Sequence, residues 1–400
     1  MSYFSQIAIK AADSPTIDAF NRIRVSNPVT IFNSKQLHTS APEIWGEATT
    51  GTGTTSTHDP DTATTELGVA ATTAGSLTRQ TFRRFNYQPG KSQFILMTGN
   101  VRGLVANVTK RIGMFNAQNG VFFEFDDVAS VVVRSYATGS AVDTAVAQSS
   151  WNVDKMDGTG PSGITLDWTK TQIFTFDYEW LGVGRVRFGV VIDGLVHYVH
   201  YANHANNETV VYMSTPNLPL TYSISNDGTG AVTTLDHICS TVLTEGGADP
   251  TGDLESHERT GVSVATGDIN AIILLRLNSA HLDDVVGILD FSVVGTATND
   301  ILLTQLILNP TVAGTALTWN TTMHESVDVA EGITGDNTVT GGKVLLSNVG
   351  TGRSTIGGRT PDPTVTLGVD QSDVSDVLAL VVTSANAATI WTALNWTVLS

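Results

Sequence analysis

PSGITLDWTKTQIFTFDYEWLGVGRVRFGVVIDGLVHYVHYANHANNETVVYMSTPNLPLTYSIS, residues 161–225, is the stretch that decides the fold. Val, Ile, Phe, Tyr and Thr alternate with polar residues along it, and Gly, Pro and Asn interrupt the runs. Alternation with a period of two is typical of the short β-strands of a sandwich or jelly roll. The dipeptide Asp193-Gly194, between two alternating runs, predicts a two-residue hairpin turn. We therefore expect an all-β protein.

Similar runs elsewhere predict two β-sandwich domains, for which a chain of 400 residues has room at about 100–200 residues per domain. A polar, Gly- and acid-rich stretch separates the two domains, and a Thr-, Gly- and Ser-rich stretch precedes the first. One short helical turn is expected within 384–394. The expected parts are an extended N-terminal arm (1–48), an exposed loop (49–76), a jelly-roll-like β-sandwich (77–245), a linker (246–260) and an acidic β-sandwich (261–400).

The composition limits the classes of partner. The formal net charge is −17, and residues 251–400 contain 16 acidic but only 5 basic residues. A surface this acidic repels phosphate backbones, so we expect no nucleic-acid partner. No apolar run approaches the ~18 residues of a membrane span and no secretory leader is recognisable, so no membrane insertion is expected. The single cysteine, Cys239, excludes an intrachain disulfide and fits folding in a reducing cytoplasm.

Two segments are candidates for contacts with other chains. The arm is extended around Pro15 and Pro28, and its apolar side chains need a surface on their own domain or on a neighbouring subunit. In LTRQTFRRFNYQPGKS (77–92), arginines are interleaved with aromatic residues, a pattern also found in single-strand nucleic-acid binding. The acidic surplus instead favours ion pairs between subunits or domains. The predicted interface residues are Ile17, Phe20, Ile23, Val25, Ile31, Phe32, Arg79, Arg83 and Arg84.

Over roughly residues 15–245, the chain resembles a family of tailed-bacteriophage virion proteins. The blocks that carry the resemblance are DAFNRIRVSNPVTIFNSKQ (18–36), YQPGKSQFILMTG (87–99), QSSWNVDKMDGTGPSGITLDWTKTQIFTFDYEWLGVGRVRFGVVIDG (148–194) and STPNLPLTYSI (214–224). The resemblance implies a structural component of the virion, made in the cytoplasm of the bacterial host. It implies no chemistry and does not separate head from tail.

Three histidines, His197, His200 and His204, are close enough in HYVHYANH to suggest a metal site. In a regular strand, however, His197 and His200 lie on opposite faces because their separation is odd. We therefore interpret them as surface or interface residues and predict no metal and no cofactor.

Four acidic clusters are candidates for the paired carboxylates of glycoside hydrolysis. We favour turn residues that accept hydrogen bonds from their own backbone, with calcium binding by the third cluster as a lesser alternative. These clusters are Asp59/Asp61, Asp126/Asp127, Asp154/Asp157 and Asp283/Asp284.

The seven tryptophans are most simply core residues, although one or two exposed near a loop are suited to stacking on a sugar. They are Trp45, Trp151, Trp168, Trp180, Trp319, Trp391 and Trp396.

No catalytic motif is recognisable, so we expect a noncatalytic structural component of a phage virion rather than an enzyme. The main expectation is a tail-fibre or tail-tip protein that takes part in host attachment. The alternatives are a capsid decoration or head-fibre protein and, third, a polysaccharide-cleaving tailspike. Expected partners are further copies of the chain in a homotrimer, other virion proteins, and a glycan or protein receptor on the host surface.

Overall fold

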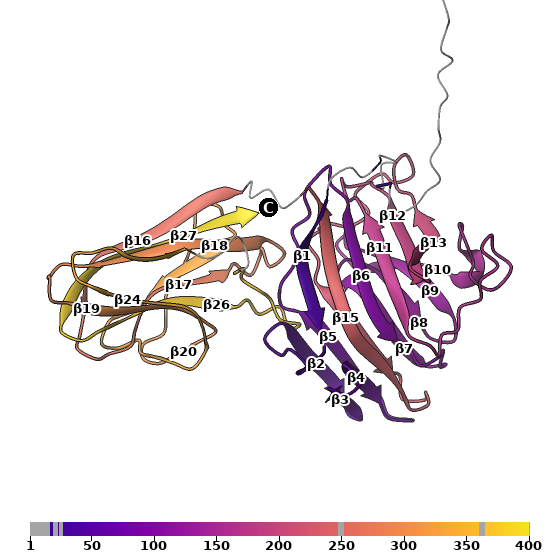
Figure 1. The fold of residues 1–400 in the computed structure, drawn as a ribbon, viewed down its shortest axis with the longest axis horizontal. Helices are drawn as coiled ribbons and strands as arrows, with labels where there is room; N and C mark the ends of the chain where they lie inside the picture. The colour runs from indigo at the N-terminus through magenta and orange to yellow at the C-terminus, as the bar shows by residue number, and fades with distance from the viewer. Residues whose placement is uncertain (1–16, 19–22, 24–26, 247–251, 360–364, 400) are drawn as a thin grey trace, which may run out of the picture. The chain divides into compact units, whose positions relative to one another are not determined.

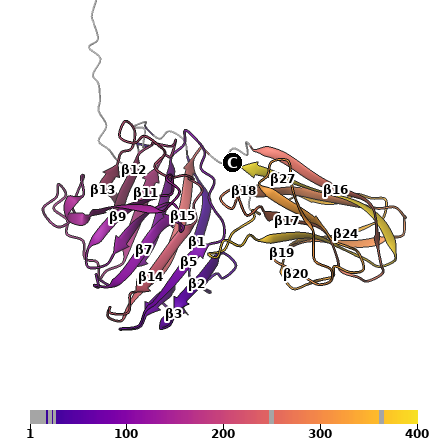
Figure 2. The same cartoon turned by 180° about the vertical axis from the view of Figure 1, so that it is seen from behind.

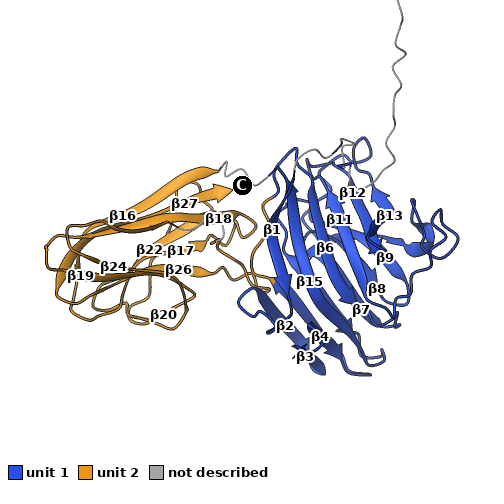
Figure 3. Cartoon of the chain, viewed as in Figure 1, with its two compact units in different colours: residues 1–80, 87–248 blue, residues 81–86, 249–400 orange. Residues whose placement is uncertain are grey.

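The computed structural model describes residues 17–18, 23, 27–246, 252–359 and 365–399. In this part of the chain the regular elements are strands, with one short 3-10 turn, η1 (Gln148–Ser150). The chain divides into two compact units (Figure 3). Unit 1 comprises residues 1–80 and 87–248, and unit 2 comprises residues 81–86 and 249–400. The expected all-β class with two sandwiches is confirmed. Within the described ranges, no helix has the length and apolar character needed to cross a membrane.

Unit 1 is built from two antiparallel sheets (Figure 1). The eight-stranded sheet consists, in spatial order, of β13 (Leu195–Ala202), β12 (Val186–Ile192), β11 (Gln172–Tyr178), β6 (Gln93–Asn100), β15 (Thr233–Glu245), β4 (Thr64–Val69) and β3 (Thr54–Asp59), and β1 (Pro28–Lys35) also pairs with β15. The seven-stranded sheet, part of which is labelled in Figure 2, consists of β10 (Val142–Ala147), β9 (Ala129–Ser135), β8 (Gly120–Phe125), β7 (Val108–Phe115), β14 (Leu220–Asn226), β5 (Gly75–Thr81) and β2 (Trp45–Gly51).

Aromatic side chains fill the space between these sheets. Phe123 of β8 lies 5.2 Å from Phe174 and 5.5 Å from Phe176 of β11, measured between ring centroids. The alternation in TQIFTFDY turns both β11 rings to the same side of the sheet. The β12–β13 turn is the predicted hairpin, because Asp193 and Gly194 both have positive φ, 51° and 78°.

The structure corrects the boundaries expected for the N-terminal third. The expected arm (1–48) contains β1 and the start of β2, both of which are strands of unit 1. The expected loop (49–76) contains β3 and β4, which pair antiparallel. Thr and Ser occupy the outward positions of a sheet as readily as they occupy loops, so composition alone did not distinguish the two.

Unit 2 is a second antiparallel sandwich. Its four-stranded sheet consists of β16 (Asp253–Val264), β27 (Ala388–Leu399), β18 (Val285–Gly295) and β25 (Ile356–Arg359). Its six-stranded sheet consists of β21 (Trp319–Thr321), β22 (Val327–Glu331), β17 (Asn270–Leu277), β26 (Val377–Ser384), β19 (Ile301–Leu308) and β24 (Lys343–Thr351). A small pair, β20 (Thr311–Val312) with β23 (Val339–Thr340), completes the unit.

The main core of unit 2 is formed by buried side chains of both sheets, among them Trp396, Phe291 and Leu380. Two further expectations are corrected here. The expected linker (246–260) includes the first half of β16, and the segment expected to contain a helical turn (384–394) contains the end of β26 and the start of β27. Unit 2 also includes residues 81–86, so the expected limits 77–245 and 261–400 do not follow the two units.

Candidate functional site

The outer face of the four-stranded sheet of unit 2 exposes an indole ring. Trp391 of β27 is 53% exposed, whereas its neighbours Ile390 and Thr392 are buried because they point toward the core. Of the other tryptophans, Trp180 and Trp319 are half-buried, and the remaining four are buried. Trp391 is therefore the tryptophan that is available to a ligand.

The strand pairing defines what surrounds Trp391. Its partner on β18 is Val294, and the next row on the same face holds Ala393 between Ser292 and Glu258. Opposite Trp391, β16 has a register shift between Arg259 and Val262. Ala393 and Ser292 are small, and the indole of Trp391 remains 53% exposed.

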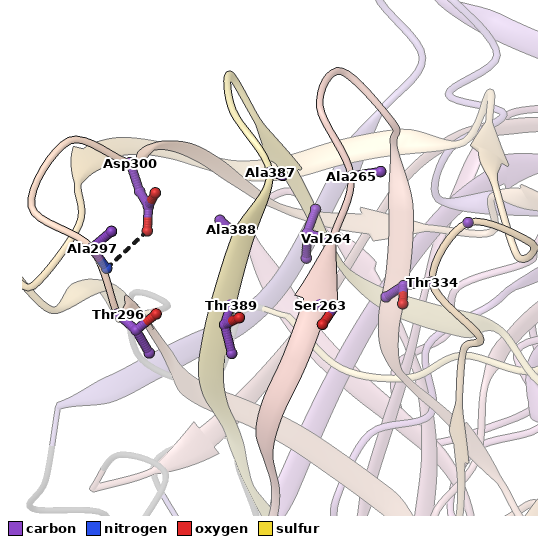
Figure 4. Close-up of a pocket in the computed structure, with 11 residues that line it drawn as sticks. Ser263, Val264, Ala265, Thr296, Ala297, Asp300, Thr334, Ala387, Ala388 and Thr389 are labelled. Carbon is purple, nitrogen blue, oxygen red and sulfur yellow. Dashed lines mark hydrogen bonds between the residues drawn. The ribbon is translucent and has the colours of Figure 1, made fainter.

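A row of hydroxyl groups lies one row away. Thr296, Thr389 and Ser263 come from three adjacent segments, because the Thr296 amide donates to the Thr389 carbonyl over 2.9 Å and Thr389 pairs with Ser263. Thr334 continues the row in Figure 4. These side-chain hydroxyls make no hydrogen bond to any residue in the described ranges. Together with Asp300 and small residues they line a hollow of about 500 Å³ (Figure 4).

A second, polar hollow of about 540 Å³ adjoins the first and shares Ser263 and Thr334 with it. Arg259 is fixed at its wall: its Nη1 donates to the Ile272 and Gly332 carbonyls, and its Nε lies 3.0 Å from Glu331 Oε2. The hollow therefore presents an ordered guanidinium–carboxylate pair beside the hydroxyl row.

Two carboxylates lie on the exposed face beside β27: Glu258 is opposite Ala393, and Asp290 is opposite Asn395. Glu258 is exposed and makes no hydrogen bond or ion pair with the described part of the chain. Asp290 is half-buried and accepts a hydrogen bond from the amide of Asn395. They lie two strands apart and two residues out of register, so strand spacing and rise separate their Cα atoms by about 12 Å. Flexible carboxylate side chains at that separation can reach the spacing of about 6.5–9.5 Å used by inverting glycosidases.

This face is chemically suited to a sugar polymer. An exposed indole offers a flat apolar surface with little conformational entropy to lose, as the apolar face of a pyranose ring requires. The hydroxyls of Thr389 and Ser263 and the carboxylates of Glu258 and Asp290, at neighbouring positions of the same sheet, supply acceptors and donors for sugar hydroxyls.

The alternation along β27 indicates which face Trp391 occupies. Trp391 and Trp396 are an odd number of residues apart in one strand, so period-two alternation places them on opposite faces. A helical turn within 384–394 would interrupt this alternation, and the strand β27 stands there instead.

The three histidines of HYVHYANH are arranged differently from the prediction. Strand β13 has a register shift, in which His197 pairs with Val190 and His200 with Phe188. Val190 and Phe188 are two residues apart, so both histidines lie on the same side of the sheet and the expectation of opposite faces is wrong. In the described ranges, no three or more His, Cys, Asp or Glu side chains are grouped to hold a metal ion.

The acidic clusters behave largely as turn residues. Asp59 accepts from the Asp61 amide, Asp126 from the Val128 amide, and Asp157 from the amide and hydroxyl of Thr159. Asp154 accepts from the Met156 and Ser162 amides. Asp284 differs, because it accepts from Ser326 and lies 3.6 Å from His281.

Other carboxylates of unit 1 are held by arginines. On the outer face of the seven-stranded sheet, Glu124 lies 2.7 Å from Arg111 Nε, and Asp143 lies 2.7 Å from Arg134 Nε. The hydrogen bond from Arg134 lowers the pKa of Asp143. A carboxylate kept ionised in this way is poorly suited to delivering a proton.

The predicted arm residues do not form one surface. Ile17 is buried and its carbonyl accepts from Arg187 Nη2 over 2.6 Å, within unit 1. Ile23 is 67% exposed, and Ile31 and Phe32 are half-buried in β1. Phe20 and Val25 lie outside the described residues.

The predicted arginines are divided between the units. Arg79 is buried in unit 1, where it pairs with Glu47 and donates to His237 Nδ1 over 3.2 Å. Arg83 and Arg84 belong to the segment assigned to unit 2. Arg84 Nε donates to the Leu282 carbonyl over 2.7 Å. The ion pair of Arg79 is thus internal to unit 1.

No protein-family model and no curated protein matches the chain. Several solved structures are similar to it. A mixed-linkage glucan GH16 protein from Bacteroides ovatus is 10% identical over 53% of this chain and 100% of its own, with a TM-score of 0.36. A β-1,3-glucanase from Mycobacterium marinum is 11% identical over 54% and 98%, with a TM-score of 0.34. The carbohydrate recognition domain of Emp47p is 7% identical over 54% and 95%, with a TM-score of 0.31.

These matches correct one expectation from the sequence. We expected no enzymatic activity, and that expectation does not stand, because proteins described as a GH16 and as a glucanase are among the similar structures. At such identities and TM-scores the matches assign no reaction to this chain. The chemistry must be argued from its own residues.

Proposed function

We propose that the chain is a carbohydrate-recognition protein whose unit 2 binds a neutral polysaccharide on the exposed face of the β16-β27-β18-β25 sheet. The observation that carries this proposal is the 53% exposure of Trp391 on that face. Burying an indole that water now contacts is favourable, and a pyranose ring matches its flat shape. The hydroxyl row of Thr296, Thr389 and Ser263 hydrogen-bonds the adjoining sugar units.

The charge of the molecule selects the ligand. Residues 251–400 contain 16 acidic and 5 basic residues, and Glu258 and Asp290 belong to the binding face itself. Such a surface repels uronic acids, sulfated sugars and phosphate-containing polymers. The ligand is therefore an uncharged glucan, mannan or galactan rather than an anionic glycan.

The setting we propose is the particle of a tailed bacteriophage, on the basis of the sequence blocks between residues 15 and 245. A protein that recognises a cell-surface polysaccharide fits the attachment machinery of such a particle better than its shell. Locating the chain in an electron cryomicroscopy map of the intact particle tests this setting. Copies on the tail support it, and copies spread over the head contradict it.

The binding proposal is tested with Trp391→Ala and affinity electrophoresis through gels that contain soluble neutral polysaccharides. We expect the intact chain to be retarded by at least one of them and the variant to bind at least ten times more weakly, which is about 1.4 kcal/mol. Met323→Ala is the matched control, because Met323 is 98% exposed in the same unit but lies outside this face. Equal retardation of wild type and Trp391→Ala would contradict the proposal.

Hydrolysis of the bound glycan is a second candidate function, favoured by the two carboxylates that lie opposite Ala393 and Asn395. Asp290 and Glu258 stand on opposite sides of the strand that carries Trp391. The same polysaccharides are incubated with the protein and assayed for new reducing ends. Activity lost in both Glu258→Gln and Asp290→Asn, with binding retained, supports cleavage. Retardation without any reducing ends supports recognition alone.

A further inference from the structure

Unit 1 contains a separate hollow that the carbohydrate proposal does not use. It has a volume of about 410 Å³ and is lined by inward-facing residues of β9, β10 and β12, by the end of β13 and by the segment that follows β13. This volume lies within the range of about 300–1,000 Å³ that is typical of small-molecule sites. An apolar cavity of about 150 Å³ is already large enough for benzene, so a molecule with two fused rings fits here.

The walls of this hollow are mainly apolar. Val131 and Val133 of β9 are buried, and Val146 of β10 is half-buried. At the rim, Val142 and Val210 are 53% and 51% exposed. Water in contact with such a surface is released when an apolar molecule enters, which favours binding.

Two histidines of the lining have assigned tautomers. His200 Nδ1 accepts a hydrogen bond from the Asn152 amide over 3.3 Å, so its proton is carried by Nε2. His204 Nδ1 lies 2.6 Å from the Gly184 carbonyl and must donate, which leaves the lone pair on Nε2. Burial lowers the pKa of both rings, so both are neutral at pH 7.

The Nε2 atoms of these histidines make no hydrogen bond with any residue in the described ranges. One offers a proton and the other a lone pair, which is the pair of partners that a single hydroxyl group needs. The ring of His204 is held in place by stacking on Tyr212, with centroids 4.0 Å apart and planes 5° apart. Glu208, also in the lining, disfavours an anion.

We propose that this hollow binds a neutral, mainly apolar ring compound that carries one hydroxyl group. The rings lie against the valines of β9 and β10, and the hydroxyl accepts from His200 and donates to His204. The site lies in unit 1 and does not depend on the glycan face of unit 2, so either proposal can fail without the other.

The test uses the full chain and three fluorescent probes of similar size: 2-naphthol, naphthalene and 2-naphthoate. We expect 2-naphthol to bind at least ten times more tightly than either of the others, because naphthalene lacks the hydroxyl and naphthoate is charged. Equal binding of 2-naphthol and naphthalene would overturn the role of the histidine pair, and no binding of 2-naphthol up to its solubility limit would overturn the site.

Two variants locate the binding. Val146→Phe fills the hollow and is expected to weaken 2-naphthol binding at least tenfold, whereas Val128→Phe adds the same ring at a 42% exposed position outside the lining and leaves binding unchanged. His200→Phe is expected to reduce the affinity for 2-naphthol to that for naphthalene. Thermal unfolding of each variant shows whether it is folded. Unchanged binding in a folded Val146→Phe variant contradicts the proposal.

Discussion

Lys110 shows how one buried charge is accommodated in unit 1. Its side chain is fully hidden, and its Nζ donates to the carbonyls of Val101 and Gly103 and to the hydroxyl of Thr233. Burial nevertheless lowers the pKa of Lys110 to about 8, because three acceptors do not replace the hydration of an ammonium group.

This shift has a definite sign for stability. The unfolded chain keeps the proton on Lys110 up to about pH 10.4, whereas the folded chain releases it near pH 8. Between these two pH values the unfolded state binds more protons, so the unfolding free energy rises as the pH rises above 8. We expect the unfolding free energy of the wild type to rise by about 1–2 kcal/mol relative to that of Lys110→Met from pH 8 to pH 9.5. Urea unfolding at several pH values measures it. A difference that stays constant across this range would show that the acceptors hold the proton in place.

Two positions show which local features can be predicted from the sequence. Asp193-Gly194 was predicted as a turn because the two-residue turn needs positive φ at both positions, a requirement that is local in sequence. Trp391 was not singled out, because its exposure depends on which face of β27 meets the core, and that requires the strand assignment to be right first.

At the scale of elements, the pairing of β1 with β15 is the feature that the sequence does not predict. It pairs with β15 from Pro28 opposite Glu245 to Lys35 opposite Cys239, partners more than two hundred positions away. The prolines of the arm favour extended backbone whether or not a partner exists, so no local signal names β15 as that partner. Composition and periodicity are local properties and do not predict strand pairs that are this far apart in sequence.

The pairing predicts how truncation acts. Removal of residues 1–40 leaves the edge of β15 from Cys239 to Glu245 without β1, although β6 still pairs with its other side, and removes Ser34, which accepts from the Trp45 indole over 2.9 Å. We expect this truncation to lose about 3 kcal/mol or more of unfolding free energy and to aggregate through the bared edge. The control removes residues 1–16 and keeps β1. Differential scanning calorimetry with light scattering measures both effects, and equal stability of the two truncations would refute this role for β1.

The bulge of β13 is a second feature of this scale. Sequence periodicity placed His197 and His200 on opposite faces, yet one unpaired residue in the strand turns them to the same side. Bulges arise from the requirements of neighbouring strands, so the pocket that contains His200 and His204 was not predictable from HYVHYANH alone.

At the scale of the whole molecule, the chain passes between its two units three times. It leaves unit 1 after residue 80, returns at residue 87 and leaves again after residue 248. The short segment contributes to unit 2 directly: the Phe82 carbonyl accepts from the Val369 amide over 2.9 Å, and Arg84 donates to Leu282. The composition predicts a domain boundary near residue 246 and does not indicate that residues 81–86 belong to unit 2.

Unit 2 is therefore expected to be incomplete when only residues 249–400 are produced. We predict that this fragment unfolds at a lower temperature than unit 2 in the intact chain, and that a synthetic peptide of residues 78–89 restores part of the difference. Calorimetry with and without the peptide tests this. A peptide in which Arg84 is replaced by Met serves as the control and is expected to restore less. A fragment as stable as the intact unit would contradict the prediction.

Because residues 81–86 belong to unit 2, they also limit which genetic recombinants keep unit 2 intact. A genetic crossover near codon 249 would join the C-terminal half of one parent to residues 81–86 of another, so the side chain at position 84 that donates to the Leu282 carbonyl would come from a different lineage. Recombinants made at that point must tolerate a mismatch inside a folded unit. Two exchanges, or one upstream of residue 81, are needed to transfer unit 2 intact, so the coding regions of the two units are expected to be inherited together.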